Sequence, residues 1–381
     1  MGISDRRALA GIAPAVMAAM LCLALPGGAD AAPVYRLELL PTSHPGGFSQ
    51  AFAVNGAGTI AGRATQNGGA NPGTLFQGAG VTILPGLGGS IGVAYDINEA
   101  GMVAGFATVA GNGAYHAFRY TPGGGTVDLG TLGGANSYAY SVNASGVVVG
   151  FSQLSNNGSH GFVHDGTGMV DIGSAYGPTG GSAAYGINDS GQVTGTTTVE
   201  FAPGRFGARA MIWQSGGFNV LGVLGTGNSS TGYEINNAGW VTGWSNTIGL
   251  GETRAFLWNG TSMLNLGSLG GDMSQGYGLN EAGDVVGMAR LANTLDVGFL
   301  YTDGTMFDLN TLLDGSEPAG RYRITAAEGI GENGWILANA WDTQLARNVG
   351  VVLKTATDVP EPASLAVFGV AMLGLALRRR G

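Results

Sequence analysis

The stretch Ile97-Asn98-Glu99-Ala100-Gly101-Met102-Val103-Ala104-Gly105 is one copy of a phrase that this chain repeats seven times. The phrase places Asn after an apolar residue, Gly three positions after the Asn, and Val or Ile two positions after that Gly. In the degenerate seventh copy, Gly331 takes the place of Asn. The steps from one copy to the next are 43, 45, 45, 48, 44 and 51 residues. A period of this length, in segments that have the residue pattern of β-strands, predicts a propeller or a solenoid. The Asn residues of the six other copies are Asn55, Asn98, Asn143, Asn188, Asn236 and Asn280.

Each phrase joins two expected strands by a tight turn. The segment before the Asn is apolar, and the segment after the Gly alternates, as in Val147-Val148-Val149-Gly150-Phe151. Asn suits the first position of a turn because its side chain bonds to nearby backbone, and Gly accepts the positive φ that closes a type I turn with a bulge. We therefore expect a hairpin at every copy.

Two further segments complete each repeat. A third segment carries His116-Ala117-Phe118 in one copy and Arg254-Ala255-Phe256 in another. A fourth carries Val127-Asp128-Leu129-Gly130 and its equivalents. The third segment occurs seven times, but the fourth occurs only six times after the first Asn, and residues 35–40 supply the missing one at the front of the chain.

This offset decides between the two architectures. A chain that begins with a fourth strand and ends with a third can close a ring, because one sheet then combines strands from both termini and leaves no exposed edge. We therefore predict an all-β, seven-bladed β-propeller closed by the N- and C-terminal strands. The alternative is an open β-solenoid of ~45-residue repeats, which would instead need capping units at its ends.

Composition argues against nucleic acid as a partner. Glycine makes up 72 of 381 residues, and the formal net charge is −9. The two ends, 1–32 and 355–381, hold five of the 16 basic and four of the 25 acidic residues, so 11 basic and 21 acidic residues remain between them. A phosphate-binding protein needs a clustered basic face, and this middle part has no run of Lys or Arg.

The N-terminal residues 1–32 have the pattern of a signal peptide. Arg6-Arg7 precede a mostly apolar stretch, and Ala29-Asp30-Ala31 offers small residues at a cleavage site. The only cysteine, Cys22, lies inside this segment, so the mature chain would have neither a disulfide nor a thiolate.

The C-terminal residues 355–381 combine three sorting features in order. Val359-Pro360-Glu361-Pro362 ends the folded part, residues 365–377 are apolar and long enough for a short membrane helix, and Arg378-Arg379-Arg380 would stop the helix with its C-terminus inside. This end resembles the PEP-CTERM sorting signal of Gram-negative bacteria. The resemblance implies an exosortase-like processing enzyme, transient attachment to the inner membrane, release or attachment at the cell surface, and an organism that makes exopolysaccharide.

The repeats themselves resemble the extracellular HAF repeat family, whose name-giving His-Ala-Phe stands here at 116–118. The resemblance covers most of residues 34–354, and copies such as 160–162 and 297–299 depart from it. It implies an extracellular location, but it does not imply any particular catalytic or binding activity. The three expected parts are therefore a signal peptide at 1–32, the seven-repeat propeller at 33–354, and the sorting tail at 355–381.

The sequence points to no catalytic residues, metal ligands or cofactor. His116 and His160 occupy the same repeat position, which favours a structural role, and the lone lysine, Lys354, does not follow a phosphate-binding loop. The variable residue after the turn Gly is Trp in two copies. Trp240 and Trp335 are candidate ligand platforms for sugar rings or a protein, with packing against a neighbouring blade as the alternative.

Two functions remain open at this point. The first is a non-catalytic binding or matrix protein at the cell surface, with a polysaccharide or a surface protein as its partner. The second is a carbohydrate-active hydrolase or lyase that uses acidic residues brought together at the propeller axis. Nothing in the sequence selects a pair of carboxylates for the second.

Overall fold

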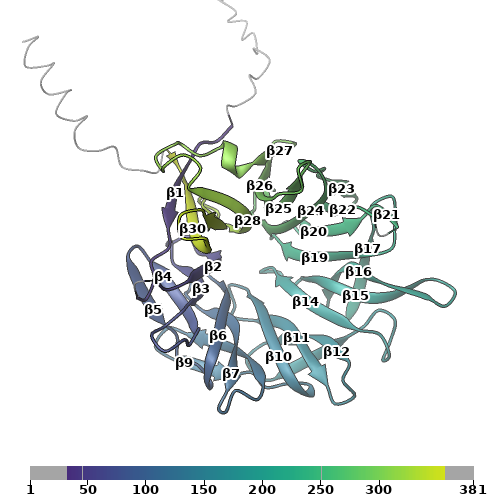
Figure 1. Cartoon of the computed structure of the whole chain (residues 1–381). Helices are drawn as coiled ribbons and strands as arrows, with labels where there is room; N and C mark the ends of the chain where they lie inside the picture. Colours follow the sequence, from purple (N-terminus) through teal and green to yellow (C-terminus); the bar gives the residue numbers. More distant parts are fainter. Residues whose placement is uncertain (1–31, 45, 250, 357–381) are drawn as a thin grey trace, which may run out of the picture. The chain divides into compact units, whose positions relative to one another are not determined.

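A computed structural model describes residues 32–356 except 45 and 250. Its strands run from Tyr35 to Thr355 and form a succession of small antiparallel sheets around a common axis (Figure 1). One short 3-10 helix, η1 (Leu309–Thr311), interrupts them. The prediction of an all-β fold is therefore confirmed for the described residues.

Four of the sheets each contain four strands that are consecutive in the sequence. They are β2 (Ser49–Val54), β3 (Ile60–Ala64), β4 (Gly73–Gln77) and β5 (Gly80–Ile83); β6 (Gly88–Ile97), β7 (Val103–Val109), β8 (Tyr115–Thr121) and β9 (Gly125–Asp128); β10 (Gly133–Val142), β11 (Val148–Leu154), β12 (Ser159–His164) and β13 (Met169–Gly173); and β14 (Ser182–Ile187), β15 (Val193–Ala202), β16 (Arg205–Gln214) and β17 (Gly217–Gly222).

Another eight strands are connected into one sheet. They are β19 (Ser230–Ile235), β20 (Val241–Asn246), β22 (Thr253–Trp258), β23 (Met263–Asn265), β24 (Gly270–Leu279), β25 (Val285–Leu291), β26 (Asp296–Thr302) and β27 (Thr305–Asp308). The link between its halves is a single parallel pairing, Thr253 with Met273. Two dipeptide strands, β18 (Thr226–Gly227) and β21 (Ile248–Gly249), pair separately.

The remaining sheet joins the two ends of the strand sequence. Its order is β1 (Tyr35–Leu39), β30 (Arg347–Thr355), β29 (Ile336–Asp342) and β28 (Tyr322–Ile330). The register pairs Tyr35 with Thr355 and Leu39 with Val351. The predicted partnership of the first and last strands is thus confirmed, whereas an open solenoid would keep these strands apart.

The Asn of the repeated phrase has two tasks, one within its sheet and one between sheets. In the turn after β6, the Asn98 side-chain oxygen accepts from the Met102 backbone N–H, and Gly101 has φ +76°. The Asn98 side-chain amide then donates to the Asn143 carbonyl in the next sheet, at 2.8 Å. The same bond to the next copy is made by Asn55, Asn143, Asn188 and Asn236. These five bonds connect the turns of successive sheets.

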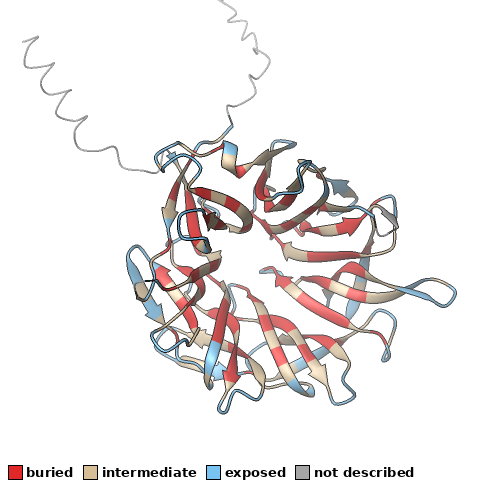
Figure 2. Cartoon of the chain, viewed as in Figure 1, coloured by how far each residue is buried: buried red, intermediate tan, exposed pale blue. Residues whose placement is uncertain are grey.

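Apolar cores fill the space between neighbouring sheets. One cluster, for example, joins Val142, Val148 and Phe162 to Ala104 and Ala117 of the preceding sheet. The buried residues therefore form bands across the middle of every sheet (Figure 2). Because each sheet buries a face on both sides, stability depends on contacts between neighbours as well as within sheets.

Candidate functional site

A bulge in the innermost strand of each sheet directs one side chain toward the axis. In β10, Ala139 pairs with Gly150 and Ser141 with Val149, so Tyr140 is the extra residue that the partner strand does not match. Such a bulge re-aims a side chain at the price of one ladder pairing. The equivalent residues, each three positions before the Asn position, are Phe52, Tyr95, Tyr140, Tyr185, Tyr233, Tyr277 and Glu328.

These seven residues form a collar in which six aromatic rings follow one another and Glu328 holds the remaining place. Ring centroids are 4.9 Å apart for Phe52–Tyr95 and Tyr95–Tyr140, 5.2 Å for Tyr140–Tyr185, 5.4 Å for Tyr185–Tyr233 and 5.7 Å for Tyr233–Tyr277. These separations fall in the range of favourable edge and tilted contacts between aromatic rings. Burial among the rings raises the pKa of Tyr185 to about 12.

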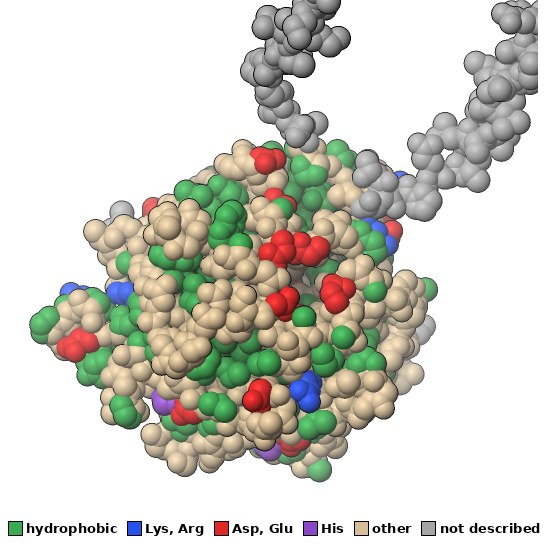
Figure 3. Space-filling model, turned by 180° about the vertical axis from the view of Figure 1, so that it is seen from behind, with side chains coloured by type: hydrophobic (Ala, Val, Ile, Leu, Met, Phe, Trp, Pro, Cys, Tyr) green, Lys and Arg blue, Asp and Glu red, His purple; other side chains and the backbone are tan. Residues whose placement is uncertain are grey.

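The collar borders a cavity of about 570 Å³, the axial cavity, which is lined by the innermost strands and the turns that follow them. Seven carboxylic side chains lie in its wall, and the described residues that line it include no Lys, Arg or His. They are Asp96, Glu99, Asp189, Glu234, Glu281, Glu328 and Glu332. On the face seen in Figure 3, acidic side chains gather around a hollow near the centre.

Three of these carboxyls lie on the strands themselves rather than at the turns. Asp96 accepts hydrogen bonds from the Ser141 hydroxyl and the Val142 backbone N–H, both at 2.8 Å, and so ties β6 to β10. Glu328 accepts from the Asn339 side-chain amide at 2.6 Å. Burial raises the pKa of both carboxyls, because the charged form loses hydration that these bonds only partly replace.

Glu234 has the weakest support of the three. Its side chain accepts one hydrogen bond, at 3.1 Å, from the N–H of the following residue, Ile235. Burial, together with the negative charge of Asp96, raises the pKa of Glu234 to about 8. The carboxyl of Glu234 is therefore mostly protonated at neutral pH.

The other carboxyls belong to turns at the rim of the cavity. In each case the residue after the Asn position accepts from the equivalent backbone N–H of the preceding sheet: Glu99 from Gly56 at 2.7 Å, Asp189 from Ala144 at 2.9 Å, Glu281 from Asn237 at 2.9 Å, and Glu332 from Glu281 at 3.1 Å. The rim carboxylates thus link neighbouring turns and also give the cavity mouth its negative charge.

The raised pKa of Glu234 predicts that stability falls as pH rises. Below about pH 4.5 this carboxyl is protonated in both states; between there and about pH 8 only the unfolded chain ionises, so unfolding is favoured progressively. Because Glu234 is only half-buried, we expect a total loss of about 2 kcal/mol rather than the full value that the shift implies. Glu234→Gln should flatten this part of the curve.

Denaturant unfolding between pH 4 and 9 measures this effect. The exposed Glu252, replaced by Gln, is the matched control and should keep the wild-type pH profile. A Glu234→Gln profile parallel to that of the wild type would contradict the assignment.

The two candidate platform tryptophans are half-buried and have packing partners. A Cβ on Gly283 would lie 2.6 Å from the Trp240 ring, and one on Gly58 would lie 3.1 Å from the Trp335 ring, so each ring covers the turn glycine of the next sheet. The Lys354 ammonium also lies 4.3 Å from the centre of the Trp335 ring. These contacts match the packing alternative, and the ligand platform stays a prediction.

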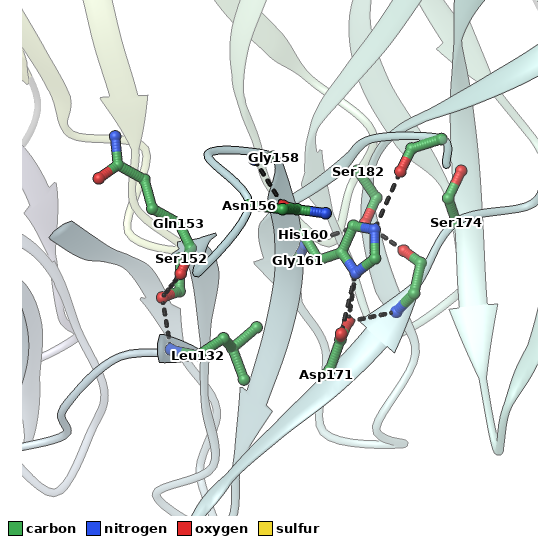
Figure 4. Close-up of polar contacts among 12 residues, drawn as sticks. Leu132, Ser152, Gln153, Asn156, Gly158, His160, Gly161, Asp171, Ser174 and Ser182 are labelled. Carbon is green, nitrogen blue, oxygen red and sulfur yellow. Dashed lines mark hydrogen bonds and ion pairs between the residues drawn. The ribbon is translucent and has the colours of Figure 1, made fainter. Parts of the chain in front are cut away.

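The repeated histidines make contacts between strands. His160 Nδ1 lies 2.9 Å from the Asp171 carboxylate, while Nε2 lies 2.9 Å from the Gly180 carbonyl (Figure 4). His116 pairs with Asp128 in the same way, at 2.8 Å. The neighbouring Ser182 hydroxyl donates to Gly173 and accepts from the Gly161 N–H, so these groups bond to structural partners rather than to each other. Among residues 32–356, apart from 45 and 250, no group of three His, Cys, Asp or Glu is placed to hold a metal ion.

The predicted sorting residues, Val359, Pro360, Glu361, Pro362 and Arg378–Arg380, lie outside the described residues. Within the described part, no helix has the length and apolarity to cross a membrane.

Comparison with solved structures supports the fold assignment. The chain is similar to the β-propeller domain of the trilobed protease from Pyrococcus furiosus, at 10% identity and a TM-score of 0.55, covering 83% of this chain and 99% of that one. It is also similar to the acylaminoacyl peptidase of Pyrococcus horikoshii, at 11% identity and a TM-score of 0.51, covering 80% of this chain and half of that one. At these identities the likeness shows the fold alone, which is a β-propeller.

Comparison of the sequence with protein families identifies a sorting signal. No curated protein matches the chain. Residues 358–380 match the PEP-CTERM protein-sorting motif, which confirms this part of the sequence interpretation. The chain therefore carries a signal for processing by an exosortase-type enzyme, and with it for export to the cell surface or the medium.

Proposed function

We propose that this chain is an exported surface protein that binds a ligand of the extracellular matrix, a component of exopolysaccharide, in the axial cavity. The observation that carries the proposal is the axial cavity itself. Seven bulges, one in each innermost strand, direct seven side chains toward this cavity, and each bulge leaves one residue of the ladder unpaired. Bulges of this kind are over-represented next to functional sites. The sorting motif supports the location, and the HAF-repeat resemblance and a Gram-negative source remain predictions from the sequence.

The ring in this proposal has seven blades of four strands. Seven innermost strands supply one collar residue each, and the eight-stranded sheet counts as two blades because one residue pair joins its halves. The seventh blade consists of β28, β29, β30 and β1.

Binding without catalysis fits the acidic residues best. Asp96 and Glu328 are engaged in hydrogen bonds between or within blades, as a supporting framework would be. A second candidate, a carbohydrate-active hydrolase or lyase, is favoured by one observation: Glu234, with a pKa of about 8, could act as an acid, and the carboxyl of Asp96 lies close enough to raise that pKa further.

A polysaccharide array probed with the secreted protein tests the proposal, when read for both retention and product release. Retention without product supports binding, and released oligosaccharide supports the enzyme. Tyr185→Ala should lower retention at least tenfold by opening the collar between Tyr140 and Tyr233. Tyr176→Ala is the control, because Tyr176 is an exposed aromatic that contacts Phe206 outside the cavity. Equal retention by both variants would contradict an axial site.

The sorting motif predicts a processed C-terminus. An exosortase-type enzyme would cut near Pro360-Glu361-Pro362, within the matched motif. We expect the surface form to lack the residues beyond about Glu361 and the signal peptide. Glu361→Ala should leave the propeller folded but hold the chain in the inner membrane. Mass spectrometry of the surface fraction checks this, and an intact peptide containing residues 365–377 there would favour a simple anchor.

A further inference from the structure

We propose that the ligand of the axial cavity carries primary ammonium groups. This inference rests on the proposed function, and it names the ligand's chemistry. It starts from the charge balance of the cavity wall: seven carboxylic side chains, no lining Lys, Arg or His, and, within the described residues, no ion pair between a cation and Asp96, Glu234 or Glu328.

Carboxyls buried without a cation are costly, and proteins normally pair them. Elsewhere in this chain the pairing is observed: Arg36 bonds to Asp314, Arg290 to Asp296, and Lys354 to Glu38. In the described part of the chain, the axial carboxyls have no such partner, and the cavity wall that they share supplies no cation. Burial raises the pKa of Asp96, Glu234 and Glu328, and a cationic ligand would favour their charged forms by supplying the counter-charge that the cavity wall lacks.

The aromatic collar is an independent feature that selects the same chemistry. The face of a tyrosine ring carries negative electrostatic potential and attracts a cation within about 6 Å of its centre. Glu328 is the one collar residue that is not aromatic, and burial together with the negative charge of Glu328 raises the pKa of Tyr277. An ammonium at this level would contact a carboxylate and aromatic rings together.

The carboxyls also recur along the axis, which favours a ligand with several ammonium groups. Glu328 lies at the collar, Asp96 and Glu234 come one residue later on their strands, and the rim carboxylates follow at the turns. An anionic polysaccharide would meet like charge at every level. Two sources share the required chemistry, a glycan of amino sugars with free amines and a linear polyamine.

Calorimetric titration of the mature secreted protein tests this with four probes: a glucosamine trimer with free amines, its N-acetylated counterpart, spermidine, and an oligogalacturonate as the anionic comparison. We expect the free-amine trimer to bind at least tenfold more tightly than the acetylated one. Binding of spermidine with no binding of either trimer would identify the polyamine as the source and keep the ammonium assignment. Equal affinity for the two trimers, or tighter binding of an oligogalacturonate, would overturn it.

Variants locate the effect. Glu328→Gln should weaken binding of the free-amine trimer at least tenfold, and Asp303→Asn, in an exposed turn between β26 and β27, should leave it unchanged. The probe comparison on the wild-type protein stands even if Glu328→Gln does not fold.

Two outcomes distinguish failure of this inference from failure of the proposed function. If Tyr185→Ala still abolishes matrix retention while both trimers bind equally, only the ammonium assignment fails. If Tyr185→Ala leaves retention unchanged, the axial site itself fails.

Discussion

Replacing Gly150 by alanine is expected to destabilise the protein by about 3 kcal/mol or more, because the new methyl group would collide with fixed backbone. A Cβ at this position would lie 1.9 Å from the Tyr138 carbonyl oxygen. That carbonyl belongs to the bulged strand β10 and cannot retreat without disturbing the bulge that holds Tyr140. The variant should therefore lose both stability and the local shape of the collar, as measured by denaturant unfolding and by ligand retention.

Gly168 supplies the control within the same sheet. It lies in the turn between β12 and β13, and nothing lies within 4 Å of a Cβ built there. Gly168→Ala should change stability by no more than about 0.5 kcal/mol. Comparable losses at the two sites would show that the close backbone approach at Gly150 is not what requires glycine.

Removing residues 34–40, and with them β1, is the second change with a large expected effect. The deletion takes Tyr35 and Leu37 from one core cluster and Leu40 from another, and it leaves β30 as an edge strand that pairs only with β29. Loss of the Leu37 side chain alone should cost about 3 kcal/mol or more, so the deletion should lower the melting temperature by many degrees.

Two point variants on this strand separate burial from strand pairing. Leu37 is 3% exposed and Leu39 is 47% exposed on the same short strand. Leu37→Ala should destabilise strongly, whereas Leu39→Ala should stay within about 0.5 kcal/mol of the wild type. A truncated chain that melts within a degree or two of the parent would contradict a closed ring.

The sequence was sufficient to predict the repeat, the turn, and the pairing of the first strand with the last strand in one sheet. The turn can be predicted because it depends on local contacts alone. The Asn98 side chain accepts from the Met102 backbone N–H four residues later, and Gly101 adopts the positive φ that the turn needs. The tyrosine three residues before the Asn is also visible in the sequence, but its direction is not. A bulge shifts the alternation of the strand by one residue, so a strict period of two gives the wrong face for Tyr140.

The axial carboxyls were beyond prediction for a different reason. Asp96 and Glu234 lie in non-adjacent repeats, and their repeat position holds Ser141, Gly186 and Gly278 in other copies, so no pattern marks it. Only closure of the ring brings these two residues to one cavity. The sequence left two alternatives for Trp240 and Trp335, a ligand platform or packing against a neighbouring blade, because the contact partners lie in the turn of the following sheet and no local pattern marks them.

The position of β30 within its sheet has a mechanical consequence. The sorting motif follows shortly after the end of β30, and this strand lies between β29 and β1 rather than at an edge. Its register pairs seven residues with β29 and five with β1. A pull along the strand from its C-terminal end would load both ladders in shear, so that their bonds resist together instead of opening one after another. The N-terminal strand thus braces β30 against tension applied beyond its C-terminal end.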